Sequence, residues 1–261
     1  MDLEEYFNSE EKPLDKLVDG LSNTGIFRKM AFIGDSLSSG EFESRDDEGK
    51  SGYNDYYEYS WGQYIARKNG FKAYNFSRGG MTAKWYVEGY ADEKGLWNVN
   101  LACQGYVVAL GVNDIFGQKQ PLGSVDDIDL ENPENNKPTF AGYLGKIISR
   151  YKKIQPQAKF FFVSMPRESE DMSDPKNLLK KEHAELLYDL CKKYDNSYVI
   201  DLFKYAPVYD EEFKKHFYLY GHMNAEGYIL TAKMIDSYID YIIRRNPDDF
   251  RRVPFIGKGL K

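Results

Sequence analysis

The chain has 261 residues, enough for one sizeable α/β domain with a well-buried core. Its formal net charge is −6 and its basic residues are dispersed, which argues against nucleic acid as a partner. Two cysteines, Cys103 and Cys191, are too few for a disulfide framework, and we expect both to be reduced. The acidic N-terminus and the lack of any long apolar run predict a cytoplasmic protein with no membrane span.

Strand-like and helix-like segments alternate along the chain. Short apolar runs predict strands at 30–34, 71–76, 105–110, 159–164 and 197–202. Helical patterns lie at 60–69, from Thr82 onward, and at 139–154, 175–194 and 224–244. Residues 14–21 carry a weaker helical pattern. The segments 41–59 and 117–138 show no clear period and are predicted to be long loops, which in compact domains are often functional.

This alternation predicts an α/β fold with a parallel sheet and helices on both faces. Five strands joined by right-handed crossovers fit the flavodoxin-like strand order 2-1-3-4-5. We expect a single domain over residues 29–245. An N-terminal extension, residues 1–28, would pack on it, and residues 246–261 would form a C-terminal tail. Nothing in the sequence specifies an oligomeric state.

The stretch 30–40, M-A-F-I-G-D-S-L-S-S-G, sets Ser36 on the turn after the first strand. Ligands of open parallel sheets bind beyond the carboxyl ends of the strands, and the predicted order makes the loop with Asn113 face that of Ser36. A serine hydroxyl becomes a good nucleophile when a base takes its proton. We therefore predict Ser36 as a nucleophile, with Asp35 beside it in a supporting role.

The three histidines are the candidate bases. His222 follows the last predicted strand and just precedes the last helix, at the same sheet edge as Ser36, so it is the favoured base. His183 lies in the charged pattern K-K-E-H-A-E and is predicted to be a solvated surface residue, while His216 is ambiguous. No histidine pair has the spacing of metal ligands, so the prediction contains neither a metal nor a cofactor.

Acyl transfer also needs hydrogen-bond donors for the oxyanion that develops on the carbonyl oxygen. The candidates are the backbone N–H groups of Ser36 and of Gly80, in S-R-G-G-M-T, and the side-chain amide of Asn113, in L-G-V-N-D. Arg78 and Trp85 are predicted substrate contacts near Gly80, and a surface salt bridge is the alternative role of Arg78.

Four blocks together carry a resemblance. In chain order, G-D-S-L-S-S-G, N-F-S-R-G-G-M-T, L-G-V-N-D and G-H-M-N-A-E-G-Y resemble those of the SGNH, or GDSL, hydrolase family, over roughly residues 30–230. The resemblance implies a three-layer α/β/α sandwich and metal-independent ester hydrolysis through an acyl-enzyme. It implies Ser36 as nucleophile and His222 as base. Gly80 and Asn113 would bind the oxyanion together with the Ser36 amide.

The chain departs from the family at one position. The family usually carries an aspartate three residues before the histidine to orient the imidazole, and Leu219 stands there. A backbone carbonyl near Leu219 would give a Ser-His dyad, which is our first choice. A carboxylate from elsewhere, such as Asp210 or Glu211, is the second possibility, and impaired activity is the third.

The polar segment 41–59 and the aromatic residues Trp61, Trp85 and Tyr86 predict a polar, aromatic-lined cleft. No long apolar stretch lies near Ser36, which favours a short acyl group, acetyl, on a carbohydrate-like or small polar alcohol. The alternatives are a lysophospholipase or thioesterase of the same family, and a catalytically impaired SGNH-fold binding protein. A nucleotide or flavin binder would use S-L-S-S-G to hold phosphate.

Overall fold

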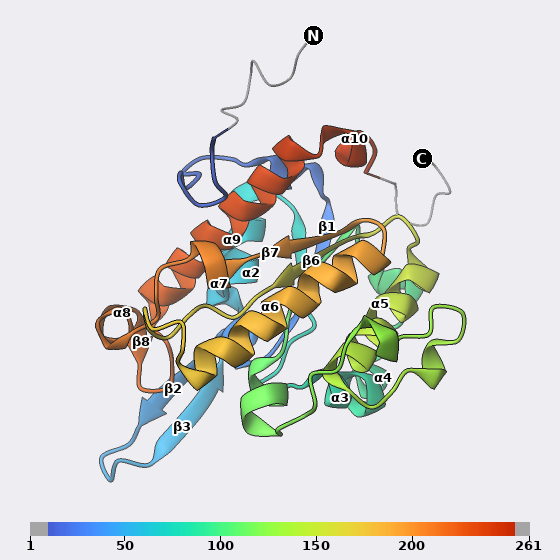
Figure 1. Cartoon of the computed structure of the whole chain (residues 1–261). Helices are drawn as coiled ribbons and strands as arrows, with labels where there is room; N and C mark the ends of the chain where they lie inside the picture. The colour runs from blue at the N-terminus through green and yellow to red at the C-terminus, as the bar shows by residue number, and fades with distance from the viewer. Residues whose placement is uncertain (1–9, 254–261) are drawn as a thin grey trace.

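A parallel five-stranded sheet forms the centre of the computed structural model, which describes residues 10–253 (Figure 1). Its strands, in spatial order, are β4 (Lys72–Asn75), β1 (Lys29–Gly34), β5 (Gly105–Ala109), β6 (Lys159–Val163) and β7 (Ser197–Ile200). Renumbered among themselves, these strands have the order 2-1-3-4-5, so the predicted fold class is confirmed. The first residues of the predicted N-terminal extension (1–9) and the last of the tail (254–261) lie outside the described residues.

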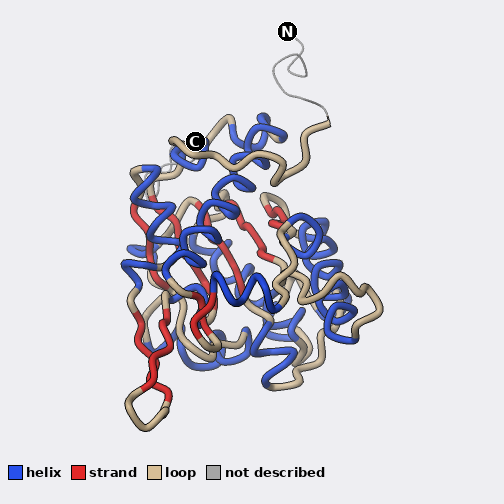
Figure 2. Tube along the Cα trace, turned by 90° about the vertical axis from the view of Figure 1, so that its left-hand side faces the viewer, coloured by secondary structure: helices blue, strands red, loops and turns tan. Residues whose placement is uncertain are grey.

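Helices flank both faces of this sheet (Figures 1 and 2). The α-helices are α1 (Ser36–Ser39), α2 (Trp61–Asn69), α3 (Ala83–Trp85), α4 (Ala91–Glu93), α5 (Phe140–Ile154), α6 (Pro175–Lys193), α7 (Leu202–Tyr205), α8 (Glu211–Phe217), α9 (Ala225–Arg245) and α10 (Pro247–Phe250). No helix within residues 10–253 is both long enough and apolar enough to cross a membrane.

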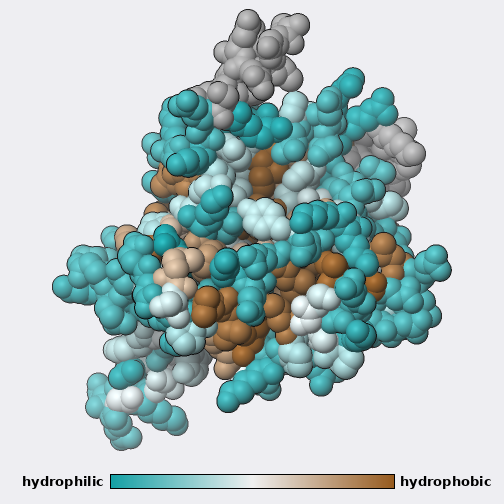
Figure 3. All heavy atoms as spheres, in the orientation of Figure 1, coloured by the Kyte–Doolittle hydropathy of each residue, from teal (hydrophilic) through white to brown (hydrophobic). Residues whose placement is uncertain are grey.

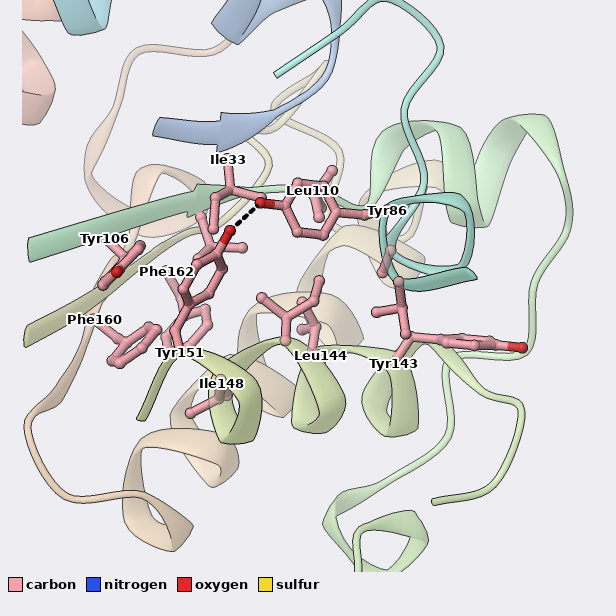
Figure 4. Close-up of a cluster of buried hydrophobic side chains, with 14 of the residues drawn as sticks. Ile33, Tyr86, Tyr106, Leu110, Tyr143, Leu144, Ile148, Tyr151, Phe160 and Phe162 are labelled. Atoms are coloured by element: carbon pink, nitrogen blue, oxygen red, sulfur yellow. Dashed lines mark hydrogen bonds between the residues drawn. The ribbon is translucent and has the colours of Figure 1, made fainter. Parts of the chain in front are cut away.

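The sheet separates two hydrophobic clusters because successive side chains of a strand point to opposite faces. Ile33 of β1 belongs to the cluster that α5 and α6 cover, and Phe32 belongs to the cluster that α2 and α9 cover. Figure 4 shows the first cluster, in which the hydroxyls of Tyr86 and Tyr151 lie 2.5 Å apart. That hydrogen bond satisfies two buried polar groups inside an otherwise apolar core.

The predicted loop 41–59 is wrong in its first part, because the chain there forms a β-hairpin. Strand β2 (Glu41–Arg45) pairs antiparallel with β3 (Ser51–Asp55). The alternation in E-F-E-S-R is short and rich in charge, so it gave no strand signal, and the cross-strand hydrogen bonds decide the conformation instead. The hairpin projects from the body of the molecule (Figures 1 and 2), and its end is hydrophilic (Figure 3).

The weak helical pattern at 14–21 is also a wrong prediction, since these residues form turns and irregular structure. Eight residues are too few to form a stable helix without packing of an amphipathic face. Long-range hydrogen bonds hold this segment instead. Val18 N–H donates to Ser237 Oγ of α9 at 2.8 Å, and Lys68 Nζ of α2 donates to the Val18 carbonyl at 2.6 Å.

Helix α2 approaches β1 so closely that Gly62 has no room for a side chain. A Cβ there would lie 2.7 Å from the Phe32 ring, which also meets Trp61 edge to face at 5.2 Å. We expect Gly62→Ala to lower the free energy of unfolding by about 1–3 kcal/mol, because the core must shift to admit a methyl group. Urea unfolding measures this change.

Gly20→Ala is the matched control, since nothing lies within 4 Å of a Cβ at that position. It should change the free energy of unfolding by less than about 0.5 kcal/mol. Equal urea midpoints for the two variants would contradict the tight packing of α2 on β1.

Candidate active site

Ser36 is the first residue of α1 and follows β1 after a single intervening residue, Asp35. Asp35 caps this short helix, because its carboxylate accepts a hydrogen bond from Leu37 N–H at 3.0 Å. Burial raises the pKa of Asp35 to about 6. This hydrogen bond from the Asp35 side chain to the Leu37 backbone holds the turn that carries the partly exposed Ser36.

The turn that carries Gly80 is attached to the end of β1. Arg78 N–H donates to the Gly34 carbonyl at 3.2 Å, and Met81 N–H donates to the Arg78 carbonyl at 3.1 Å. Gly80 has a φ of 72°, in the left-handed region that glycine adopts without strain. The sequence S-R-G-G-M-T therefore forms a tight turn beside the segment that leads to Ser36.

Asn113 begins the π-helical turn η6 (Asn113–Gly117) that follows β5. Its side-chain amide donates to the Met81 carbonyl at 3.2 Å, which leaves its second amide hydrogen for another acceptor. The neighbouring Asp114 accepts a hydrogen bond from Ala83 N–H at 2.8 Å, and burial raises the pKa of Asp114 to about 7. These bonds join the segment after β5 to the turn of Gly80.

His222 lies in a small hairpin between α8 and α9, in which β9 (His222–Met223) pairs with β8 (Tyr218–Leu219). Its Nδ1 lies 3.3 Å from Glu43 Oε2, and its Nε2 lies 3.0 Å from Glu41 Oε1. In the described structure no hydrogen bond joins His222 to the Ser36 hydroxyl. Leu219, at the position of the family's aspartate, is 47% exposed.

Glu43 is a site residue that is absent from the sequence predictions. Asp210 and Glu211, the carboxylates predicted to replace the missing aspartate, have other partners. Asp210 caps α8, and Glu211 Oε1 lies 3.8 Å from Lys214 Nζ. Glu43 belongs to β2, far from His222 in sequence and within a segment predicted to be a loop. The alternation E-F-E puts Glu41 and Glu43 on one face once β2 has formed, but it is too short to predict that strand.

The prediction for His183 is wrong, since this residue is fully buried. Its ring packs against Phe140 at 5.4 Å, and a Cβ on Gly111 would lie 2.8 Å from its Nε2. Lys181 and Glu182 beside it are exposed, whereas Lys180 is buried like His183. His216 is exposed and lies 2.9 Å from Glu212. Among residues 10–253, no cluster of three or more His, Cys, Asp or Glu residues could hold a metal ion.

The aromatic residues expected to line a cleft divide into two groups. Trp61 and Tyr86 are buried in the two core clusters. The prediction is wrong for Tyr86, which is fully buried, whereas Trp61 also lines the mainly apolar cavity described below. Trp85 is partly exposed, and the Arg78 guanidinium lies over its ring, 5.2 Å from the centroid. The exposed Arg78 therefore makes a cation–π contact with Trp85, the other predicted substrate contact.

An open cavity of about 400 Å³ borders the site on the side of the β2–β3 hairpin. Its lining is polar and comes from Glu41, Tyr53, Asp55, Arg78 and Gly79. Glu41 also lies beside the His222 ring, and Gly79 precedes the predicted oxyanion residue. A bound molecule here would meet both a carboxylate and a guanidinium.

A second cavity of about 300 Å³ is mainly apolar. Its lining includes Leu37, next to Ser36, and Gly221 and Met223, on either side of His222. Val112 and Met165 add apolar surface from the ends of β5 and β6. The sequence shows no apolar run near Ser36, because this lining is assembled from separate segments.

A sequence profile of the GDSL-like lipase/acylhydrolase family matches residues 32–230. The chain belongs to this family. As a GDSL-like acylhydrolase it is a carboxylic ester hydrolase, as the four sequence blocks predict. A search of curated protein sequences found no match.

Solved structures similar to this GDSL-like acylhydrolase include three that match 82–90% of the chain. A protein from Lactobacillus plantarum is 17% identical, with a TM-score of 0.61 over 82% of this chain and 97% of that one. A family two carbohydrate esterase from Clostridium thermocellum, in complex with cellohexaose, is 15% identical, with a TM-score of 0.56 over 90% and 67%. A possible lipase from Chitinophaga pinensis is 18% identical, with a TM-score of 0.53 over 84% and 98%. These similarities show a shared fold.

Acid should destabilise this acylhydrolase through His183, because desolvation lowers the pKa of the buried ring to about 4. Between that value and the ordinary pKa of about 6.5, the unfolded chain binds more protons than the folded one, so the free energy of unfolding decreases as the pH is lowered. Over that window His183→Leu should gain, relative to wild type, on the order of 3 kcal/mol in the free energy of unfolding. Urea unfolding at several pH values measures the difference.

His216→Gln serves as the control, because it removes an exposed histidine and no buried ring. In this variant the free energy of unfolding should depend on pH as it does in wild type. If His183→Leu also keeps the wild-type pH dependence, protonation of His183 does not destabilise the fold in acid.

Proposed function

We propose that this chain hydrolyses short-chain esters, acetyl esters above all, of carbohydrate-like or small polar alcohols, with Ser36 as nucleophile and His222 as base. The observation that carries the proposal is the chain of contacts among the four family blocks. The turn of Gly80 is bonded to Gly34, and Asn113 to Met81. Tyr228 of α9 donates to the Glu41 carbonyl at 2.6 Å, next to the segment of Ser36.

In the first half-reaction, His222 Nε2 takes the proton of the Ser36 hydroxyl as Oγ bonds to the acyl carbon. The carbonyl electrons move to its oxygen, and the resulting oxyanion meets the N–H groups of Ser36 and Gly80 and the free amide hydrogen of Asn113. Nε2 then gives its proton to the departing alcohol oxygen. Water repeats these steps on the acyl-enzyme. The Ser36–His222 hydrogen bond would form as substrate binds, as is common for catalytic groups.

The polar cavity beside Glu41 and Arg78 supports the choice of a polar alcohol. Hydroxyl groups of a sugar can donate to the Glu41 and Asp55 carboxylates and accept from the Arg78 guanidinium. Trp85 beside Arg78 offers an exposed aromatic face. The similar carbohydrate esterase from Clostridium thermocellum was solved with cellohexaose, which agrees with a carbohydrate as the alcohol part.

The apolar cavity favours a second candidate, a lysophospholipase or thioesterase with a longer acyl chain. It borders the segments of both Ser36 and His222, although neither residue lines it. An acyl chain in this cavity would bury apolar surface against Leu37 and Met223. The two candidates differ in acyl length and share the same chemistry.

Ser36→Ala should abolish ester hydrolysis and labelling by a fluorophosphonate probe. Loss of the nucleophile is expected to lower kcat by at least about a thousandfold. Ser44→Ala, at an exposed position on β2, should behave as wild type. Wild type that takes no label would favour a binding protein. Equal labelling of the Ser36 variant would show that another residue reacts with the probe and would exclude Ser36 as the nucleophile.

Acyl-chain preference distinguishes the two candidates. We expect the p-nitrophenyl acetate ester to give a higher kcat/KM than the octanoyl ester, because the open cavity is polar. A preference for octanoyl would favour the lysophospholipase or thioesterase and assign the apolar cavity to the acyl chain.

A further inference from the structure

Strand β2 presents three charged side chains to the hairpin that carries His222. Glu41, Glu43 and Arg45 alternate along β2 and so lie on one face of the strand. The Arg45 guanidinium lies over the Tyr220 ring, 4.1 Å from its centroid. The two glutamates contact the next two residues of the same hairpin.

Glu43 makes the more specific of these contacts. Its Oε2 accepts a hydrogen bond from Gly221 N–H at 2.8 Å and lies 3.3 Å from His222 Nδ1, with hydrogen-bond geometry. Ser51 of β3 donates to its other oxygen at 3.1 Å. Glu43 is 8% exposed, and the hydrogen bond from Gly221 holds the pKa of its carboxyl below the usual value. The Glu43 carboxylate is therefore held at one oxygen by a backbone N–H group and at the other by a side-chain hydroxyl.

Glu41 differs from Glu43 although it has the same charge and lies on the same face of β2. Its Oε1 lies 3.0 Å from His222 Nε2, in ion-pair contact without a hydrogen bond. Burial raises the pKa of Glu41, whereas that of Glu43 is lowered. Nε2 is the atom that must reach Ser36. Because Glu41 lies beside Nε2 and not beside Nδ1, it does not hold the imidazole in the required tautomer.

We propose that Glu43 is the positioning residue that replaces the aspartate missing at position 219. By accepting a hydrogen bond from Nδ1–H, Glu43 leaves the lone pair of Nε2 available to the Ser36 hydroxyl, and it stabilises the imidazolium that forms when Nε2 takes the serine proton. The inference rests on the proposed function. It replaces the dyad with a Ser36–His222–Glu43 arrangement in which the carboxylate comes from a separate hairpin.

The test uses the distance between position 219 and the imidazole. Leu219 pairs directly with His222 across the β8–β9 ladder, and side chains at such positions lie within contact of one another. An aspartate at 219 would therefore supply a carboxylate from the family's own position. Leu219→Asp alone should change kcat by less than about threefold, because Glu43 already binds Nδ1.

Glu43→Gln is expected to lower kcat for p-nitrophenyl acetate by roughly a hundredfold, while KM changes by less than about threefold. Adding Leu219→Asp to this variant should restore most of the lost kcat. Glu48→Gln, at the exposed end of the same hairpin, removes the same charge and should behave as wild type. Urea unfolding of each variant checks that the hairpin remains folded.

Three results would overturn the inference: unchanged kcat in Glu43→Gln, a loss confined to KM, or a loss of kcat that Leu219→Asp fails to reverse. Ser36→Ala separates this failure from failure of the proposed function. An inactive Ser36→Ala with a fully active Glu43→Gln would leave the hydrolase intact and remove Glu43 from its mechanism. An active Ser36→Ala would remove the proposed function itself.

Discussion

The site depends on the parallel pairing of β1 with β4 on one side and β5 on the other. Phe32 pairs with Asn75, and Gly34 pairs with Ala109. Because the three strands run in the same direction, the chain segments that follow them emerge at one edge of the sheet. Ser36, Gly80 and Asn113 all follow these strands. Ladder hydrogen bonds in the core thus determine which loops can meet.

The sequence blocks at β1 and β5 are readable because each combines a buried apolar run with a short polar turn, whereas β4 is only partly buried. A run such as M-A-F-I-G indicates its own strand, and the parallel order follows from alternation with helices. The strand order and the family are confirmed for this reason. The roles of Ser36, Gly80, Asn113 and His222 stay predictions.

Other features could not be read from local sequence because they arise between distant segments. Glu43 contacts His222 because the β2–β3 hairpin packs against the β8–β9 hairpin. The apolar cavity draws its lining from several loops, none of which is apolar by itself. The charged residues around His183 predict a surface position, although its own side of α6 faces Gly111 and Phe140. In each case tertiary packing overrides the local pattern.

The register of β2 also determines which of its side chains face His222. A shift of one residue in β2 would turn Glu41, Glu43 and Arg45 to the opposite face and bring Phe42 and Ser44 toward the His222 loop. Insertions or deletions at the turn around Asp46 and Gly49 would therefore act on the imidazole from a distance, without altering any of the four family blocks. Among relatives, the length of this turn could decide whether a carboxylate is needed before the histidine at all.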